Sequence, residues 1–385
     1  MSVKSSGQKV LRELNKAGYE AYFVGGMVRD ALLGREIYDA DITTDAEPEV
    51  VLDLFDKTFA TGLQHGTVTV VMDSQNVEVT TFRLDGEYVD NRHPEGVCFT
   101  RSLSEDLARR DFTINAMAQA EDGTIIDPFN GQDDLEAGII RAVGDQKKRF
   151  EEDALRILRG IRFVAKLGFD IEEETLKAMT ECRYLLANLS LERIRKEFEG
   201  ILSSGEYKAK ALDFIVQNNI LEYIPFFSVL IKFKDLNRIK LVETLFAIVA
   251  FELPEPHIFL AKFPFTRGEK KTIQVLLAIR DKILDERLIL YRYGSKVLYQ
   301  RHLLNCFYSN VEFEYKLPTM IIKHRSNLAI GPQEVIDLSK KKPGKWVGKL
   351  FAEIEEEVIL ERMKNSCESI LKFIKKRGIL NAEKD

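Results

Sequence analysis

The sequence lacks any apolar run long enough to form a membrane-spanning helix. Its longest apolar runs, such as residues 245–251, fall far short of the roughly 20 residues that cross a bilayer. The first residues also lack the apolar region of a signal peptide. We therefore expect a soluble, cytoplasmic protein that has no membrane partner.

Cysteine, proline and histidine are scarce as well. The 385 residues include ten prolines, five histidines and four widely separated cysteines, namely Cys98, Cys182, Cys306 and Cys367. Without a C-x-x-C pair or a dense set of cysteines, neither a structural zinc site nor a disulfide framework is expected. The histidines show no metal-ligand spacing.

What the sequence does contain is the composition of a globular protein with several domains. Hydrophobic residues make up 45% and charged residues 30%, so the chain is neither fibrous nor broadly disordered. The net charge is −5, yet residues 291–385 contain 18 Lys and Arg against 12 Asp and Glu. Because the remainder is acidic, we expect a polyanionic partner at the C-terminal end.

The pattern of apolar residues changes near residue 145. Before it, helices are expected at residues 7–17 and 28–33, and strands at residues 21–24, 38–43, 67–72 and 77–82. After it, apolar residues recur at spacings of three and four, as in Leu155, Leu158 and Ile161. The sequence predicts an α+β fold, with a mixed sheet in an N-terminal domain and a helical remainder.

Two aspartates lie two residues apart within the expected strand at residues 38–43. On a strand, Asp39 and Asp41 would point to one face, while Tyr38 and the other apolar residues point to the opposite face. Glu78 lies on another expected strand, so a third carboxylate could converge on the pair. Such an oxygen-rich group suits Mg²⁺. A D-x-D sequence by itself is also common on protein surfaces.

A pair of glycines lies between an expected strand and an expected helix. Gly25 and Gly26 allow close approach of the backbone, and the N–H groups at a helix start can bind an anion. An ordinary turn is the alternative for this pair. A phosphate site beside metal-binding carboxylates is what nucleotidyl transfer requires, so the two features together indicate that chemistry.

Longer stretches around these residues resemble a known family. The segment from Gly25 to Arg35, followed by Asp39 and Asp41, resembles the first motif of the class II tRNA nucleotidyltransferases, the CCA-adding enzymes. Further motifs follow in the family's order: Arg109-Arg110-Asp111-Phe112-Thr113-Ile114-Asn115-Ala116, Asp127-Pro128-Phe129-Asn130-Gly131, Glu152-Asp153-Ala154-Leu155-Arg156, and Leu189-Ser190 with Glu192-Arg193-Ile194 and Glu197. The resemblance implies a polymerase β-like nucleotidyltransferase head with a mixed sheet, followed by an all-helical neck, body and tail.

This resemblance implies a role for each motif. It makes Asp39 and Asp41 the Mg²⁺ ligands and Glu78 the third catalytic carboxylate. It assigns the triphosphate and ribose to Gly25, Gly26, Arg29, Arg110, Asp111 and Asn115, with Arg159 as a candidate phosphate contact. A carboxylate at Asp111 can accept from a ribose 2′-hydroxyl, which separates ribonucleotides from deoxyribonucleotides.

Asp153 and Arg156 are expected to select the base without a nucleic-acid template. They are three residues apart on an expected helix, so both would project from one face. Cytosine and adenine present an amino donor beside a ring acceptor, which suits Asp153 as acceptor and Arg156 as donor. Uracil and guanine present the opposite order and would leave both groups unpaired, at a cost of about 1–3 kcal/mol each. An i,i+3 surface salt bridge is the alternative.

Two more segments are candidates for RNA-related roles. The loop at residues 83–94 resembles the flexible loop of enzymes that add the final A, and its candidate residues are Arg83, Asp85, Gly86, Tyr88, Asp90 and Arg92. A charged surface loop is the alternative. Near the C-terminus, the candidate tRNA phosphate contacts are Lys341, Lys342, Lys345, Lys375 and Lys376, although lysine runs are most often solvated surface.

The resemblance therefore implies a bacterial CCA-adding enzyme without a fused HD phosphohydrolase domain. It would add C, C and A from CTP and ATP to the tRNA 3′ end, contact the acceptor and T arms, and release pyrophosphate. The expected parts are a catalytic head (residues 1–140), a nucleotide-selecting neck (141–205), a body (206–290) and a tRNA-binding tail (291–385). Bacterial poly(A) polymerase, an A-adding or CC-adding enzyme, and a catalytically inactive RNA-binding protein remain alternatives.

Overall fold

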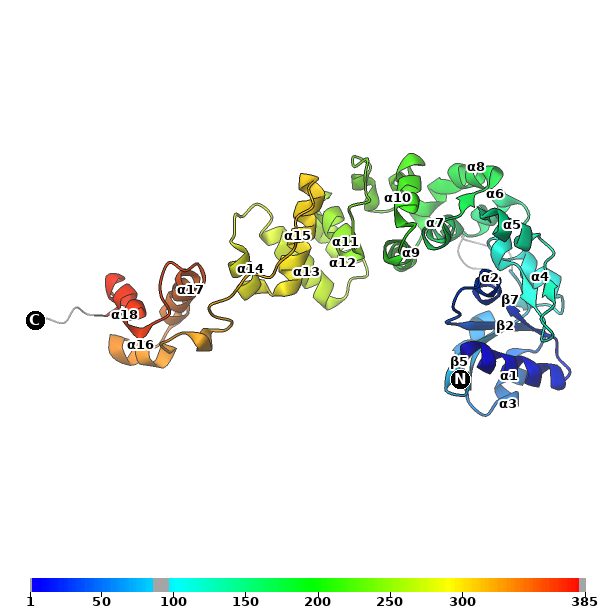
Figure 1. Ribbon diagram of the computed structural model, residues 1–385, viewed down its shortest axis with the longest axis horizontal. Helices are drawn as coiled ribbons and strands as arrows, with labels where there is room; N and C mark the ends of the chain where they lie inside the picture. Colours follow the sequence, from blue (N-terminus) through cyan, green and yellow to red (C-terminus); the bar gives the residue numbers. More distant parts are fainter. Residues whose placement is uncertain (1, 86–96, 381–385) are drawn as a thin grey trace, which may run out of the picture. The chain divides into compact units, whose positions relative to one another are not determined.

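The computed structural model describes residues 2–85 and 97–380 (Figure 1). The chain divides into two compact units, Met1–Asn237 and Arg238–Asp385, which are called unit 1 and unit 2 below. The division into head, neck, body and tail is finer than this and stays a prediction. Among the described residues, no helix combines the length and apolar character needed to cross a membrane.

A seven-stranded mixed sheet forms the centre of the N-terminal part of unit 1, in the order β3-β4-β5-β2-β1-β8-β9. Its strands are β1 (Ala21–Val24), β2 (Ala40–Thr44), β3 (Thr58–Gly62), β4 (Thr67–Met72), β5 (Gln75–Thr81), β8 (Ala118–Gln119) and β9 (Ile125–Ile126). Strands β2 and β5 pair in parallel, and the other neighbours pair antiparallel. Two small sheets pair β6 (Arg83–Asp85) with β7 (Val97–Phe99), and β10 (Ile139–Ile140) with β11 (Asp170–Ile171).

Helix α1 (Val3–Lys16) packs against this sheet. Its apolar residues at three and four spacing, Val10, Leu11 and Leu14, are fully buried, as an amphipathic helix on a sheet requires. Gly7 permits the close contact, because a Cβ there would lie only 2.8 Å from the Phe23 ring. The helix therefore supports β1 and β2, the two strands that lead into the pocket described below.

The remaining helices of unit 1 mostly follow the sheet along the chain (Figure 1). They are α2 (Gly26–Leu32), α3 (Pro48–Leu54), α4 (Leu103–Ala108), α5 (Gly131–Ala137), α6 (Gln146–Glu152), α7 (Leu155–Leu167), α8 (Glu173–Cys182), α9 (Leu191–Ser203) and α10 (Lys208–Gln217). Short 3-10 turns are η1 (Leu63–His65), η2 (Thr113–Asn115), η3 (Arg183–Asn188), η4 (Ile220–Tyr223) and η5 (Phe227–Leu230). Helix α7 packs against α9 and α10 and buries the periodic residues Leu158 and Ile161 completely.

The regular elements of unit 2 are all helices in its described residues, and residues 311–324 form neither a helix nor a strand. Its helices are α11 (Val242–Glu252), α12 (Pro256–Lys262), α13 (Arg267–Ala278), α14 (Glu286–Tyr293), α15 (Ser295–Ser309), α16 (Pro332–Ser339), α17 (Lys345–Ile359) and α18 (Cys367–Lys376), with the 3-10 turn η6 (Arg325–Asn327). A separate core near the C-terminus includes Val335, Phe351, Ile354 and Ile370, each fully buried.

The predicted α+β fold is confirmed, with two local differences. In the described chain beyond residue 145, the two-residue strand β11 interrupts an otherwise helical pattern. The strand expected at residues 38–43 begins only at Ala40, because pairing with β5 starts at the Ala40–Val77 pair. Tyr38 and Asp39 therefore precede the strand, and Tyr38 is 73% exposed rather than packed in the core.

Candidate active site

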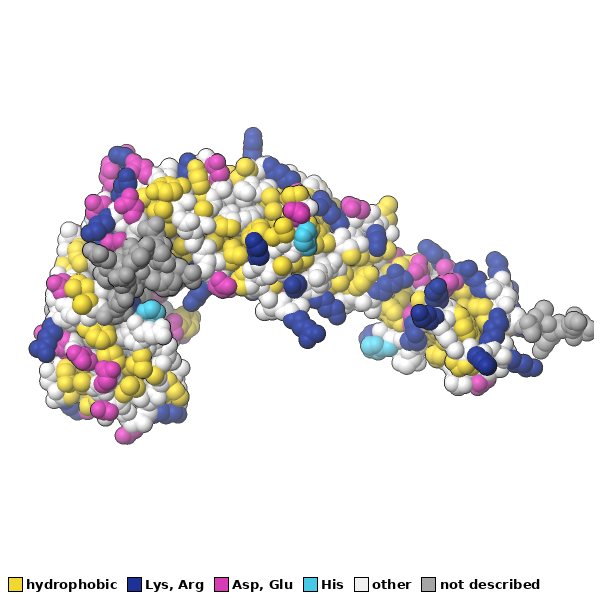
Figure 2. Space-filling model, turned by 180° about the vertical axis from the view of Figure 1, so that it is seen from behind, with side chains coloured by type: hydrophobic (Ala, Val, Ile, Leu, Met, Phe, Trp, Pro, Cys, Tyr) yellow, Lys and Arg dark blue, Asp and Glu magenta, His cyan; other side chains and the backbone are white. Residues whose placement is uncertain are grey.

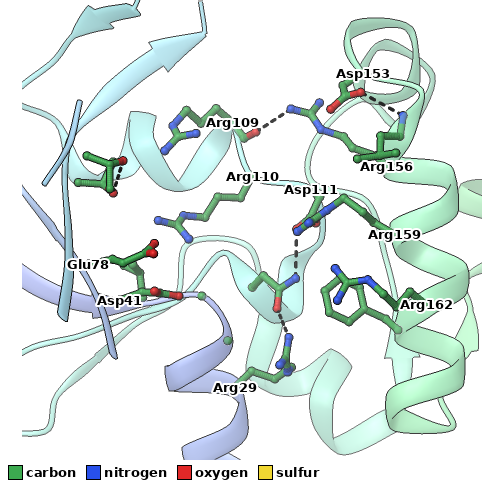
Figure 3. Close-up of a pocket in the computed structure, with 18 of the residues that line it drawn as sticks. Arg29, Asp41, Glu78, Arg109, Arg110, Asp111, Asp153, Arg156, Arg159 and Arg162 are labelled. Carbon is green, nitrogen blue, oxygen red and sulfur yellow. Dashed lines mark hydrogen bonds and ion pairs between the residues drawn. The ribbon is translucent and has the colours of Figure 1, made fainter. Parts of the chain in front are cut away.

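A pocket of about 670 Å³ lies in unit 1 where the sheet meets α7 (Figure 3). Among the described residues, nine Lys and Arg side chains and four Asp and Glu side chains line it. These residues come from segments as far apart in sequence as β1 and α9. A pocket with this excess of positive charge suits a polyanionic ligand such as a triphosphate.

Asp41 and Glu78 are neighbours on the two parallel strands β2 and β5 and are paired in register. Both line the pocket, while Ala40 and Ile42 beside Asp41 are buried. Burial, and then the nearby charge of Glu78, raise the pKa of Asp41 to about 6, although Arg110 opposes the shift. The pocket therefore holds closely placed negative charge that a bound cation would offset.

Asp39 occupies a different environment from Asp41. It precedes β2, is exposed, and is not among the residues that line the pocket. Its charge still adds to the raised pKa of Asp41, so the two carboxylates are within electrostatic reach. In the described ranges, no three acidic, histidine or cysteine side chains are gathered closely enough to form a preformed metal site.

The turn between β1 and α2 brings backbone very close to the pocket carboxylates. Gly25 has a φ of +64°, a conformation that favours glycine. A Cβ at this position would lie 3.2 Å from Arg110 Nη1 and 3.9 Å from Asp41 Oδ2. Gly25 and Gly26 both line the pocket, so the turn leaves room for a ligand beside Asp41.

A chain of hydrogen bonds connects α2 with α7 across the pocket floor (Figure 3). Arg29, only 3% exposed, donates through Nη1 to Asn115 Oδ1 at 2.6 Å. Asn115 Nδ2 donates to Asp111 Oδ1 at 3.1 Å, and Arg159 Nε donates to Asp111 Oδ2 at 2.8 Å. Burial lowers the pKa of Arg29, although its partner Asp30 opposes the shift.

Asp111 is almost fully occupied by protein donors. Besides Asn115, the backbone N–H of Phe112 donates to Oδ1, and both Nε and Nη2 of Arg159 approach Oδ2. Burial alone would raise the pKa of Asp111, but Arg159 and these hydrogen bonds outweigh it and lower the pKa to about 2. Because a carboxylate has about four acceptor positions, a ribose hydroxyl would have to displace one of these donors.

The structure places Asp153 and Arg156 in the same pocket but not on one helix. Asp153 follows α6 in an extended conformation (φ −147°, ψ 99°), and its Oδ1 accepts from Leu155 N at the start of α7. The expectation of one continuous helical face is therefore wrong, because an aspartate turn separates the two helices. Asp153 is instead oriented by Arg193, whose Nη2 lies 2.6 Å from Asp153 Oδ2.

Arg156 is held from three directions and is only 7% exposed. Its Nη1 donates to Glu152 Oε2 at 2.8 Å and to the carbonyl of Arg149 at 2.9 Å. Its Nη2 donates to the carbonyl of Arg109 at 3.1 Å. These contacts fix the guanidinium in one orientation beside Asp153, as recognition of a base edge requires.

Several lining residues were missed by the sequence reasoning. Arg162 and Lys166 extend the face of α7 that already carries Arg156 and Arg159, so the three- and four-residue spacing could have indicated them. Phe163 on this helix contacts three cations, with the guanidinium carbons of Arg29, Arg159 and Arg162 between 5.2 and 5.9 Å from its ring centroid. Arg109 and Arg193 lay within the recognised motifs but had no assigned role.

The remaining candidates belong to the loop at residues 83–94 and to the tail. Among those that the structure describes, Arg83 is the one that lines the pocket. Arg83 of β6 lines the pocket and donates to the carbonyl of His65. Asp85 ends β6, whereas Gly86, Tyr88, Asp90 and Arg92 lie outside the described residues. The candidate tail lysines belong to unit 2 and are all exposed: Lys341, Lys342, Lys345, Lys375 and Lys376.

Three family models match most of the described chain. The "Poly A polymerase head domain" matches residues 21–141, which carry the sheet and the pocket residues Asp41, Glu78 and Asp111. An "RNA and SrmB- binding site of polymerase A" matches residues 168–230. The "tRNA nucleotidyltransferase domain 2" matches residues 240–374.

Full-length relatives agree with these matches. CCA-adding enzymes of Bacillus cytotoxicus and Enterococcus faecalis are 38% and 40% identical, each over 96% of this chain and 98% and 95% of their own lengths. The structure of the Bacillus stearothermophilus CCA-adding enzyme in complex with CTP is similar, with a TM-score of 0.81, 32% identity and 97% of each chain covered. The chain therefore belongs to the family of CCA-adding enzymes, which are nucleotidyltransferases.

Proposed function

We propose that this protein adds C, C and A in sequence to the 3′ end of tRNA, using CTP and ATP. The 3′-hydroxyl oxygen of the tRNA attacks the α-phosphorus of the nucleotide, the bond to the β-phosphate breaks, and pyrophosphate leaves. The observation that carries this proposal is one pocket that joins Asp41 and Glu78 to the base-selecting pair Asp153 and Arg156. Chemistry and nucleotide choice are thereby combined at one place.

The donors around Asp41 fit a hard divalent cation. Two carboxylates are held side by side on parallel strands, and burial together with the charge of Glu78 raises the pKa of Asp41. Asp41 and Glu78 would hold Mg²⁺, and we propose Asp39 as a further ligand because it lies two residues before Asp41. When bound, Mg²⁺ would activate the attacking hydroxyl and offset the charge of the leaving pyrophosphate.

The basic residues of the pocket would hold the triphosphate. Gly25 and Gly26 leave space beside Asp41, and Arg110 extends toward the same place (Figure 3). Arg29 would act chiefly by fixing Asn115, since its own donors already contact Asn115 and Asp30. Arg159 and Asp111 are paired with each other. Part of this ion pair would have to open for Asp111 to contact the ribose and for Arg159 to contact a phosphate.

Asp153 and Arg156 would choose the base. Asp153 accepts from the amino group of cytosine or adenine, and Arg156 donates to the neighbouring ring nitrogen. Their orientations are set by Arg193 and Glu152 respectively, so the pair presents a fixed acceptor and a fixed donor. Uridine and guanosine triphosphates present the opposite order of donor and acceptor, so they would offer neither Asp153 nor Arg156 a hydrogen-bonding partner, which costs about 1–3 kcal/mol for each mismatched group.

We place the tRNA contact in the proposed tail, residues 291–385, with the candidate lysines reaching phosphates of the acceptor and T arms. On the face seen in Figure 2, many Lys and Arg side chains lie over the C-terminal part of unit 2. The five candidate lysines are exposed and therefore available to a polyanion. We also propose that the chain is divided into the head, neck, body and tail named above, and that the protein acts in the cytoplasm.

A primer-extension experiment tests the proposal. Labelled CTP and ATP are supplied to three tRNA substrates that end before CCA, after C and after CC, with Mg²⁺ present. We expect full CCA on each substrate, and no incorporation by an Asp41→Ala variant that binds tRNA normally. Long A tails would indicate poly(A) polymerase activity instead, and arrest at CC would indicate a CC-adding enzyme. Absence of incorporation by the wild type would overturn the proposal.

A further inference from the structure

Beneath the pocket lies a carboxylate that does not line it. Asp106 belongs to α4 and is completely buried. A buried carboxylate without partners would be costly, and Asp106 has two cationic ones. Arg109 donates to its Oδ1 through Nε at 2.9 Å and Nη2 at 2.8 Å, and Arg110 Nη2 donates to its Oδ2 at 3.1 Å.

Both arginines are functional candidates in their own right. Each lines the pocket, and the guanidinium of Arg110 extends toward Asp41 and Glu78 (Figure 3). The main-chain carbonyl of Arg109 accepts from Arg156, the donor of the base-selecting pair. Two adjacent guanidinium groups repel each other, so a shared carboxylate is needed to keep both in fixed positions.

The same carboxylate also connects strands that frame the pocket. Thr43 of β2, two residues after Asp41, donates through Oγ1 to Asp106 Oδ2 at 3.3 Å. The backbone N–H of Arg83, at the start of β6, approaches Oδ1 at 3.4 Å. Burial would raise the pKa of Asp106, but Arg110 and Arg109 outweigh this and lower it, so the carboxylate stays charged.

We infer that Asp106 is a positioning residue for nucleotide binding, which holds Arg109 and Arg110 in the orientation that receives the triphosphate. Arg110 Nη1 already borders the space beside Gly25 while Nη2 is held by Asp106, so loss of the charge at Asp106 would release a guanidinium that lies where the ligand must fit. The inference rests on the proposed use of CTP and ATP.

The test measures CTP binding by calorimetry, together with KM and kcat for C addition, in wild type and Asp106→Asn. The asparagine keeps the shape of the side chain but removes its charge. We expect Kd and KM for CTP to rise at least tenfold, with a smaller effect on kcat. The matched control is Asp134→Asn, because Asp134 is a buried carboxylate of the same unit that pairs with Arg141 outside the pocket. It should lower the melting temperature while leaving Kd unchanged.

A double-mutant cycle separates positioning from a purely structural role. In an Arg110→Gln background, Asp106→Asn should weaken CTP binding by a smaller factor than in the wild type, since Arg109 is then the only one of the two arginines left to orient. Equal losses in both backgrounds would overturn the inference. If Asp106→Asn does not fold, Arg110→Lys is used in its place. A lysine keeps the positive charge, but it cannot contact Asp106 with one nitrogen while a second nitrogen lies beside Gly25, as the guanidinium does.

The outcomes also distinguish this inference from the proposed function. CTP binding by Arg110→Lys at wild-type strength would overturn the role of Asp106. Failure of the wild type itself to bind CTP would overturn the proposed function, whatever the variants do.

Discussion

Asp41 on β2 and Glu78 on β5 are paired in register across the parallel strand pair of the seven-stranded sheet, and both carboxylates face the pocket. Parallel pairing matters here because it brings residues from separate chain segments to the same edge of the sheet. Burial, and then the charge of Glu78, raise the pKa of Asp41 and so favour its protonated form. The cost of ionising Asp41 in the folded protein can therefore be measured as a change in the free energy of unfolding, without any assay of activity.

The first prediction concerns pH and stability in the absence of divalent metal. The pKa of Asp41 is about 6 in the folded protein against an ordinary value of 3.8, so ionisation destabilises the fold as pH rises through this range. Asp41→Asn removes this cost. Its advantage over wild type in free energy of unfolding should grow by roughly 2 kcal/mol between pH 4 and pH 7. Urea unfolding at the two pH values measures it, and an advantage independent of pH would contradict the prediction.

The second prediction separates catalysis from RNA binding. Asp41→Ala and Asp39→Ala should each remove nucleotide addition, while the Kd for tRNA stays within a few-fold of wild type, because the proposed RNA contacts lie elsewhere. Incorporation assays and filter binding on the same preparations provide the measurement. If Asp39→Ala retains full activity, Asp39 is not a ligand and the site depends on Asp41 and Glu78 alone.

The third prediction concerns base selection by Asp153. Asp153→Ala should slow C and A addition and raise the relative use of UTP and GTP, because the group that penalises them is gone. Arg193→Ala should shift selectivity in the same direction but less, since it leaves Asp153 present without its 2.6 Å partner. As a control, Asp145→Ala removes only the N-cap of α6 and should lower stability by about 1 kcal/mol. A uniform fall in activity with unchanged selectivity would refute base reading by this pair.

The fourth prediction concerns the segment between β6 and β7. Asp85 and Val97 are cross-strand partners, so replacement of residues 86–96 by Asn-Gly can close the hairpin with a two-residue turn. If the resemblance to A-completing enzymes holds, this variant should add both C residues but stop at CC. Sequencing gels with a tRNA ending in CC test it directly. Normal A addition would show that the segment is dispensable for the nucleotide change.

The fifth prediction concerns the tail lysines. Replacing Lys341, Lys342 and Lys345 by glutamine should weaken tRNA binding and reduce the slope of log Kd against log salt by about one for each phosphate that the protein no longer neutralises. The control is a triple glutamine variant at exposed lysines of unit 1, namely Lys4, Lys16 and Lys57, which carries the same change in net charge. Equal effects of the two variants would mean that overall charge, not a specific surface, governs binding.

The sequence predicted which strands carry the site residues better than it predicted where those strands begin and how the side chains are held. Alternation of apolar residues was enough to find β2 and β5 and to place Asp41 and Glu78 on strands. It could not show that the strand starts at Ala40, because that depends on where β5 begins to pair. The assumed helix through Asp153 failed for a similar reason, since an aspartate side chain bonding to Leu155 N breaks the helix there.

The role of Asp106 could not have been found from the sequence alone. It lies only three and four residues before its partners, a spacing that in most helices gives exposed salt bridges of little consequence. What distinguishes it is complete burial beneath the pocket and a further bond to Thr43, a residue 63 positions away in the chain. Such a role follows from tertiary packing, which no local pattern encodes.

The line of contacts from Arg29 through Asn115 and Asp111 to Arg159 has a consequence for dissecting or recombining this enzyme. It joins α2 to α7, and residues as late as Arg193 complete the pocket. A fragment that stops near residue 140 would keep Asp41 and Glu78 but would lose Arg159, the cation that pairs with the buried Asp111. Chimaeras between relatives should therefore exchange whole units at the boundary after Asn237, because a junction at the end of the sheet would separate Asp41 and Glu78 from Arg159 and Arg193, which line the same pocket.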